Sequence, residues 1–559
     1  MNRTWWKEAI VYQIYPRSFQ DSNGDGIGDI PGVIQRLDYI ASIGIDVIWL
    51  NPVYQSPNDD NGYDISDYYS IMEEFGTMSD WDELLFQVHK RDMKLIMDLV
   101  VNHTSDEHQW FMESRKSKEN PYRDYYIWKQ GKPGKEPNNW RSVFGGSAWE
   151  YDEATGEYYL HVFSKKQPDL NWENPKLRDD VMSMVKWWLD KGIDGFRLDA
   201  INLIAKDPGF PDGELKPGER YADGNRFFHN LPKMHQYLQE MNKTVLSKYD
   251  IMTVGEAAFA SPEEALRLAG QDRGELDMVF TFYHMFMDLD ETGRFGHSEW
   301  KLSSLKAYFK REFDALFHKA WGAVYFGNHD FPRQVSRFGN DGEYRKESAK
   351  AFMTLLFTLP GTPFLYQGDE LGMTNAYHFT LDDYQDVETL NFIREKRNNG
   401  MGDNEILKIL KHKSRDNART PVQWDTTVHA GFSSVSPWLP VNPNYTHINA
   451  ETESKDPDSV LNYTRKLIKF RKEHIDLVYS DFNLLLPDDE SFFAYIRKST
   501  VNEYLVIVNL SDNPKEFLLE EYFTNSKYAL KALSGREDAP APGPVFLPYE
   551  SRVYGRTRQ

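Results

Sequence analysis

The chain has 559 residues, more than one ordinary domain holds, so we expect a large domain with one or two smaller ones. Its formal net charge of -21 is spread along the chain without a long basic block, which argues against a nucleic-acid partner, because phosphates need clustered Lys and Arg. There is no cysteine, which excludes disulfides, thiolate metal sites and thiol nucleophiles.

The N-terminal residues 1–6 lack the apolar core of a signal peptide. No run of about 18 apolar residues, the length needed to cross a bilayer, occurs elsewhere in the sequence. We therefore expect a cytoplasmic protein with no membrane partner, present as a monomer or a weak homo-oligomer.

Short apolar runs rich in β-branched residues recur along the chain. They are residues 9–14, 47–50, 94–100, 195–199, 252–256, 278–280, 323–326 and 362–366. Amphipathic segments separate them, such as 179–191, whose apolar residues return at helical spacing. Apolar strands that alternate with helices indicate a parallel sheet covered on its faces, and eight such units favour a (β/α)8 TIM barrel within the α/β class.

Two further regions depart from this alternation. Residues 104–172, after the third strand, are rich in Trp, Tyr, Gly and Asn and are too long for a plain loop, so they predict an inserted subdomain. Residues 479–559 show short alternating strands separated by turns, which predicts a C-terminal antiparallel β-sandwich. The barrel is then assigned residues 1–103 and 173–478.

Polar residues stand where several of the apolar runs end. They are Asp98 with Asn102 and His103, Arg197 with Asp199, Glu256, and Asn328 with His329 and Asp330. In a parallel barrel the strand ends meet at one face, so these groups should converge there. Any one of them could be a helix cap or a structural ion pair. Carboxylates gathered with an arginine and two histidines suit glycosyl transfer, in which one acid attacks and another donates a proton, but the residues alone do not assign the roles.

Four motifs resemble, in order and spacing, the signature regions of the α-amylase superfamily of glycoside hydrolases. They are DLVVNH at 98–103, GFRLD at 195–199, VGE at 254–256 and NHD at 328–330. QPDLNW at 167–172 looks like a fifth region, typical of the oligo-1,6-glucosidase and α-glucosidase branch. The resemblance covers essentially the whole chain.

The resemblance implies roles for three carboxylates. Asp199 would form a covalent glucosyl intermediate, Glu256 would act as acid and then as base, and Asp330 would stabilise the transition state. Such a double displacement retains the anomeric configuration and places the two working carboxyls about 5–5.5 Å apart. Arg197 is expected to keep Asp199 ionised, whereas Glu256 needs a pKa raised by burial and by neighbouring anions.

The resemblance also implies a pocket for a single glucose. His103 and His329 would bind its hydroxyls, and Tyr63 would stack on its ring. These assignments are family properties carried onto matching motifs, because a lone histidine is more often a core residue.

The far end of this pocket decides where the enzyme cuts. In the exo-acting branch, the equivalents of Asp60 and Arg419 close the cavity behind the terminal glucose, and Arg415 is a further candidate for the same rim. A closed end admits one glucose, so the enzyme is expected to trim chain ends.

Residues 21–29, DSNGDGIGD, alternate oxygen-bearing and small side chains, as calcium loops do. The pattern lacks the closing glutamate and flanking helices of an EF-hand, and an acidic turn would have the same composition. The resemblance implies a structural Ca²⁺, or Mg²⁺, bound by Asp21, Asn23, Asp25, Asp29 and the carbonyl of Ile27.

Ala200, directly after the expected nucleophile, bears on the linkage. In this branch valine there usually accompanies α-1,6 activity, and alanine or threonine accompanies α-1,4 activity. We therefore predict an exo-acting retaining α-glucosidase for maltose and short malto-oligosaccharides. Overlap with isomaltose is expected, because one or two methyl groups discriminate by only about 1–3 kcal/mol.

Other activities of the branch stay open. They are oligo-1,6-glucosidase, sucrose hydrolase, trehalose-6-phosphate-type hydrolase and sucrose isomerase. Phe331 and Tyr283 stand where Gln and Glu are frequent, which leaves the second-sugar site undefined. Residues 285–290 lack the arginine-rich loop of isomerases, and no clear phosphate-binding cluster is found. A non-catalytic transporter heavy chain is a remote alternative, because it needs a membrane anchor and has generally lost the catalytic acids.

Overall fold

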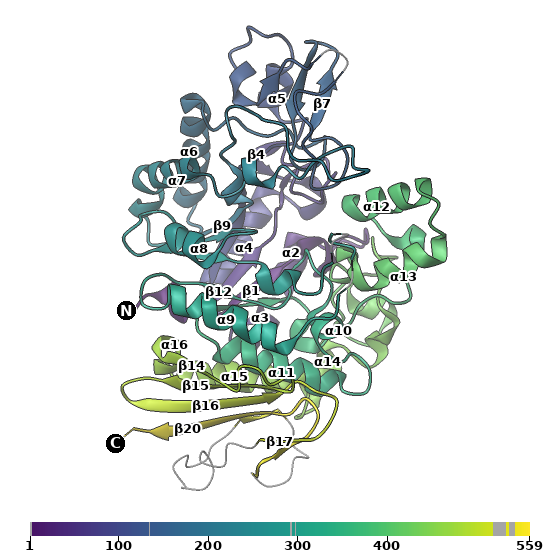
Figure 1. Ribbon diagram of the computed structural model, residues 1–559. Helices are drawn as coiled ribbons and strands as arrows, with labels where there is room; N and C mark the ends of the chain where they lie inside the picture. The colour runs from purple at the N-terminus through teal and green to yellow at the C-terminus, as the bar shows by residue number, and fades with distance from the viewer. Residues whose placement is uncertain are drawn as a thin grey trace.

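The computed structural model describes residues 3–132, 135–290, 293–296, 298–517, 533–535 and 543–558, and its centre is a parallel barrel (Figure 1). Each predicted run contains one strand of its eight-stranded sheet. The strands are β1 (Val11–Ile14), β2 (Val47–Leu50), β5 (Lys94–Val100), β9 (Gly195–Asp199), β10 (Met252–Glu256), β11 (Met278–Phe280), β12 (Ala323–Val324) and β13 (Thr362–Tyr366).

The strand order shows how the barrel closes. It runs β11-β10-β9-β5-β2-β1-β13-β12, and every pair in it is parallel. A parallel bridge between Val279 and Gly322 brings the two ends of this order together. The predicted (β/α)8 barrel is therefore confirmed.

Helices cover the outside of the barrel. They are α2 (Ile30–Gln35), α3 (Leu37–Ile43), α4 (Met78–His89), α6 (Pro175–Asp190), α7 (Pro232–Thr244), α8 (Pro262–Ala269), α9 (Leu302–Leu316), α10 (Gln334–Phe338), α11 (Arg345–Thr358) and α15 (Val460–Glu473). In α6, Asn174 caps the first turn, and Val181, Val185 and Trp188 bury the inner face. The short α1 (Trp5–Glu8) precedes β1.

Other helices extend the loop after β13. They are α12 (Val387–Asn398), α13 (Asp403–Lys413), α14 (Ala450–Lys455) and α16 (Asp476–Tyr479). In Figure 1, α12 and α13 stand at the right of the molecule and α6 and α7 at the left. Among the helices of the described ranges, none has the length and apolar content needed to span a bilayer.

The inserted segment after β5 folds around its own small core. It contains α5 (Gln109–Ser114) and a three-stranded antiparallel sheet, β6 (Trp128–Lys129), β8 (Glu157–Leu160) and β7 (Trp149–Asp152). Ala200, Leu203 and Phe228, from the loop after β9, share this core with Trp140 and Trp149. The sequence analysis placed that loop with the barrel and did not anticipate its contribution to the subdomain core.

The C-terminal region is antiparallel. The sheet order is β14 (Asp481–Leu485), β15 (Phe492–Lys498), β16 (Asn502–Asn509), β20 (Ser551–Thr557) and β18 (Leu533–Ser534), and β17 (Lys515–Glu516) pairs with β19 (Val545–Phe546). One face of the larger sheet joins the main core through Phe493, Tyr495 and Val506. The other face packs on Phe517 and Phe546 beside the smaller sheet. Parts of the predicted 479–559 domain, 518–532 and 536–542, lie outside the described residues.

Candidate active site

One buried guanidinium joins the two carboxylates expected to do the chemistry. Arg197, on β9, is 2% exposed. Its Nη1 donates to Asp199, two residues further along the same strand, and to Asp98 Oδ1 at 2.7 Å. Its Nη2 donates to Glu256 Oε2, at the end of β10, at 2.6 Å. The expected convergence of Asp199 and Glu256 is therefore seen, because a single side chain bonds both.

The backbone just after Asp199 supports the same arrangement. Ala200 has φ 41° and ψ 34°, in the left-handed region, so the chain turns sharply as it leaves β9. This turn directs the Ala200 N–H to Glu256 Oε2 at 3.0 Å. Glu256 thus accepts one hydrogen bond from a cation and one from the backbone of the neighbouring strand end.

Burial governs the protonation of this group of acids. Loss of solvation raises the pKa of Glu256 to about 7, with Asp199 and Asp330 raising it further and Arg197 opposing. Burial also raises the pKa of Asp199, to about 6, although Arg197 opposes. The expectation for Glu256 agrees with this result. Arg197 favours the ionised Asp199 as expected, but its charge does not fully offset the burial.

Asp330, the third carboxylate, has a different environment. Its Oδ1 accepts from Arg415 Nη1 at 2.9 Å and from Arg419 Nη2 at 3.4 Å. Burial acts to raise the pKa of Asp330, but the surrounding positive charge outweighs it and lowers that pKa well below its usual range. The arginines supply this charge, because burial lowers the pKa of the adjacent His329 and keeps that imidazole neutral.

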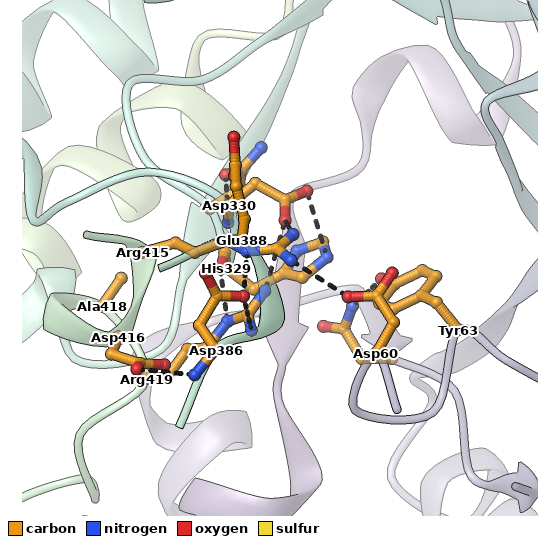
Figure 2. A network of polar contacts seen from close by, with 12 residues as sticks. Asp60, Tyr63, His329, Asp330, Asp386, Glu388, Arg415, Asp416, Ala418 and Arg419 are labelled. Atoms are coloured by element: carbon orange, nitrogen blue, oxygen red, sulfur yellow. Dashed lines mark hydrogen bonds and ion pairs between the residues drawn. The ribbon is translucent and has the colours of Figure 1, made fainter. Parts of the chain in front are cut away.

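Arg415 is the hub of the second half of the site. It donates from Nη2 to Asp60 Oδ1 at 3.0 Å and from Nε to Asp386 Oδ1 at 2.6 Å, besides its bond to Asp330. Figure 2 shows Arg415 among these carboxylates, with Arg419 beneath. The sequence analysis paired Asp60 with Arg419 and ranked Arg415 behind it. The structure instead gives Arg415 as the partner of Asp60.

The expected pocket residues Tyr63, His103 and His329 are all buried. Tyr63 stacks on His329, with ring centroids 5.2 Å apart and planes 8° apart. Asn51 donates to the Tyr63 hydroxyl, and Gln13 bonds both Asn51 and the Nδ1 of His329. His329 is thus held by protein contacts at its ring face and at both ring nitrogens, since its Nε2 lies 3.3 Å from Asp330 Oδ2.

On the other side, His103 lies among groups of the inserted segment. Its Nε2 is 3.1 Å from the carbonyl oxygen of Tyr63 and 3.1 Å from the amide nitrogen of Gln167. Gln167 also donates to Asp60 Oδ2 at 3.1 Å. Gln167 of the QPDLNW motif therefore connects His103 to Asp60.

Three acidic residues at the site were absent from the predicted set. Asp98, noted only as a strand-end residue, bonds Trp49 Nε1 at 2.6 Å as well as Arg197. Asp386 and Glu388 begin α12, where Glu388 faces Arg294 at 3.2 Å. Asp386 also caps α12 by accepting from the Thr389 N–H, so its sequence signal is that of an ordinary helix cap.

The expected metal loop, residues 21–29, turns back on itself between β1 and α2. Asp21 accepts from the N–H groups of Asn23, Gly24 and Gly26, and Asp29 caps α2 by accepting from Gly32. In the part of the chain that the structure describes, no three His, Asp or Glu side chains gather closely enough to form a metal site by themselves. The calcium site therefore stays a prediction.

Comparison with known proteins finds a matching family and relatives that agree with it. Residues 13–480 match the family described as "Alpha amylase, catalytic domain". The oligo-1,6-glucosidase of Parageobacillus thermoglucosidasius is 55% identical over 557 residues, 99% of each chain. Two solved structures superpose closely. The trehalose-6-phosphate hydrolase of Bacillus licheniformis has a TM-score of 0.93 at 48% identity, with 100% of both chains covered. The isomaltulose synthase of Klebsiella sp. LX3 has a TM-score of 0.94 at 44% identity, with 100% of both chains covered.

The two carboxyls on Arg197 generate a pH prediction. Hydrolysis through an ionised Asp199 and a protonated Glu256 loses rate below the pKa of about 6 and above the pKa of about 7. The profile of kcat/KM against pH on a disaccharide should therefore be a narrow bell between these values, which belong to the coupled pair.

An activated aryl α-glucoside is the control, because its leaving group needs no proton. The alkaline limb should then shift or disappear while the acidic limb stays. A disaccharide profile that remains flat up to pH 9 would contradict the assignment of Glu256 as the acid.

Proposed function

The chain belongs to the α-amylase family of glycoside hydrolases, and from this premise we propose that it is an exo-acting retaining α-glucosidase that releases glucose from the non-reducing ends of short α-glucosides. The observation that carries the proposal is the Arg197 guanidinium, which bonds both Asp199 and Glu256. This arrangement holds an ionised carboxylate and a protonated carboxyl side by side, as double displacement requires.

In this proposal Asp199 attacks the anomeric carbon and Glu256 gives its proton to the departing oxygen. The carboxylate of Glu256 then takes a proton from water, which attacks the glucosyl ester on Asp199 and releases glucose. Asp330 stays ionised beside Arg415 and Arg419, so it can stabilise the positive charge that develops on the ring.

The exo mode rests on the end of the pocket. Asp60 and Arg415 are both 6% exposed and form an ion pair at 3.0 Å, with Phe144 against the guanidinium. Asp386 fixes the other side of Arg415, so the pair is held on several sides. In this proposal the wall lies behind one terminal glucose and stops a chain from passing through.

Substitution of the two carboxyls tests the mechanism. Glu256→Ala should still react with an aryl α-glucoside whose leaving group needs no proton, and should then accumulate an enzyme carrying one glucosyl unit, which mass spectrometry of the intact protein detects. Asp199→Ala should show no such adduct, although both variants melt as folded proteins. Losses of about 10³-fold or more in kcat on maltose are expected for each.

Two findings would refute this assignment. One is a glucosyl adduct on Asp199→Ala. The other is product from the wild type in the inverted anomeric form, which proton NMR of fresh product distinguishes from the retained form.

For the linkage, we propose a preference for α-1,4 bonds, on the basis of Ala200. Its side chain packs in the subdomain core with Leu203 and Phe228, so this position couples the nucleophile turn to that core. A second candidate is α-1,6 hydrolysis. It is favoured by the similarity to an oligo-1,6-glucosidase that is 55% identical over 99% of this chain.

Initial rates on maltose, isomaltose, sucrose, trehalose and trehalose 6-phosphate, measured side by side, separate these candidates. Maltose should give the highest kcat/KM, and Ala200→Val should lower the maltose-to-isomaltose ratio by about 10-fold. A β-branched residue is strained at φ 41°, so Ala200→Gly serves as the control for backbone effects and the ratio is read rather than the rate. Faster cleavage of isomaltose by the wild type would replace the first candidate with the second.

We also propose that residues 21–29 bind a structural calcium ion. Asp21, Asn23, Asp25, the Ile27 carbonyl and Asp29 take the places of positions 1, 3, 5, 7 and 9 of a calcium loop, and Gly26 takes the sixth. Gly26 has φ 90°, as the sharp turn at that position demands. Such an ion would stabilise the loop and take no part in the catalytic steps.

Melting curves with and without calcium, after treatment with a chelator, test this proposal. Calcium at 100 times its Kd should add about 2.7 kcal/mol to the free energy of unfolding of the wild type. Asp25→Ala should abolish that gain, because Asp25 is exposed and otherwise bonds only within the loop. Asp38→Ala, an exposed carboxylate on α3, is the matched control and should keep the gain. A wild-type melting temperature that calcium leaves unchanged would reject the site.

A further inference from the structure

A cavity lies between the inserted subdomain, the residues just before α6 and the barrel helix α7. Its volume is about 470 Å³, within the range of about 300–1,000 Å³ usual for small-molecule sites. Its walls come from the segment around β6, from residues 171–173 before α6, from residues 204–210 of the loop after β9 and from Tyr237 of α7. Among the described residues that line it, none is a carboxylate of the candidate active site.

Two aromatic rings in the wall of the cavity each lie next to a cation. Trp128 and Phe210 are partly exposed and both line the cavity. Arg123 lies over the Trp128 ring at 3.6 Å from its centroid, and Lys129 lies over the Phe210 ring at 4.6 Å. Apolar surface is thus set next to hydrogen-bond donors, which matches the alternating C–H and hydroxyl groups of a sugar.

The charges of the lining residues are largely balanced by carboxylates. Glu157 pairs with Arg123 at 2.6 Å and with Lys118 at 2.9 Å. The Lys206 ammonium, 4% exposed, bonds Asp169 at 2.8 Å and Asn102 Oδ1 at 2.9 Å. An anion would meet few uncompensated positive charges here, whereas a neutral polyol can hydrogen-bond donors and acceptors together.

We propose that this cavity is a second saccharide site, which takes a neutral sugar the size of glucose or maltose while the catalytic pocket is occupied. The class of sugar rests on the proposed function. The second site itself rests on the separate walls and the balanced charges of this cavity.

The test is a titration of enzyme whose catalytic pocket is blocked covalently. Conduritol B epoxide, which esterifies the nucleophile of retaining glucosidases, is used to inactivate the wild type, and the excess is removed. Calorimetric titration with maltose should then show one sugar bound per chain, and inorganic phosphate should show no binding. Phe210→Ala, blocked in the same way, should bind maltose at least about tenfold more weakly, because the wall loses its ring.

Phe227→Ala is the matched control. Phe227 comes from the same loop and stacks on Trp140 at 5.6 Å, as Phe210 packs on Trp140 at 5.7 Å, but it does not line the cavity. This variant should bind maltose as the blocked wild type does, and melting curves show whether both variants fold.

The proposal is overturned if blocked wild type binds no maltose, if phosphate binds instead, or if the folded Phe210 variant binds as tightly as the Phe227 variant. A chain that the epoxide does not inactivate would count against the proposed function. A fully inactivated chain that binds no sugar would count against this cavity alone.

Discussion

The structure of the site depends on one buried positive charge shared among three carboxyl groups. Arg197 is 2% exposed and contacts Asp98, Asp199 and Glu256. One cation cannot compensate three buried anions, so the pKa values of all three acids rise, to about 6 for both aspartates and about 7 for the glutamate. The group that loses its proton last is Glu256, which sits on β10 and faces two other acids. Glu256 is thus the member of this group that keeps its proton to the highest pH, as the proposed acid must.

The electrostatic environment of Asp330 differs from that of Asp199 and Glu256. Around Asp330, two arginines face the carboxylates, since Arg415 and Arg419 both contact Asp330 and Asp386. The positive charges that directly contact Asp330 outweigh its burial and lower its pKa, so it stays ionised where Glu256 keeps its proton. The same two kinds of side chain therefore give an acid at one wall of the pocket and a permanent anion at the other. Asp330 contacts two guanidinium groups, whereas Asp199 and Glu256 share one.

The sequence could predict the parts of this site that follow a repeating rule. Each barrel strand is a buried apolar run, so a charged residue at its end stands out, and Asp199, Glu256 and Asp330 were found in that way. Asp386 was not, because it precedes a helix and has the sequence signal of a cap. Arg415 was ranked behind Arg419 because the resemblance pointed to Arg419, and both lie in the segment after β13 whose path no periodicity describes. Their positions depend on contacts between distant segments, such as that of Arg415 with Asp60, 355 residues away in sequence.

The loop after β9 shows how the nucleophile is tied to the inserted subdomain. Ala200 follows Asp199, donates its N–H to Glu256 and buries its methyl group with Leu203 and Phe228 in the subdomain core. A change in that core is therefore expected to shift the turn after Asp199 and the N–H group that bonds Glu256. In the proposal for the linkage, a substitution at residue 200 acts through this turn. Close packing transmits such a shift, because a core without voids cannot absorb it locally. Ala200, which the family resemblance associates with linkage preference, would then connect the barrel to the inserted subdomain.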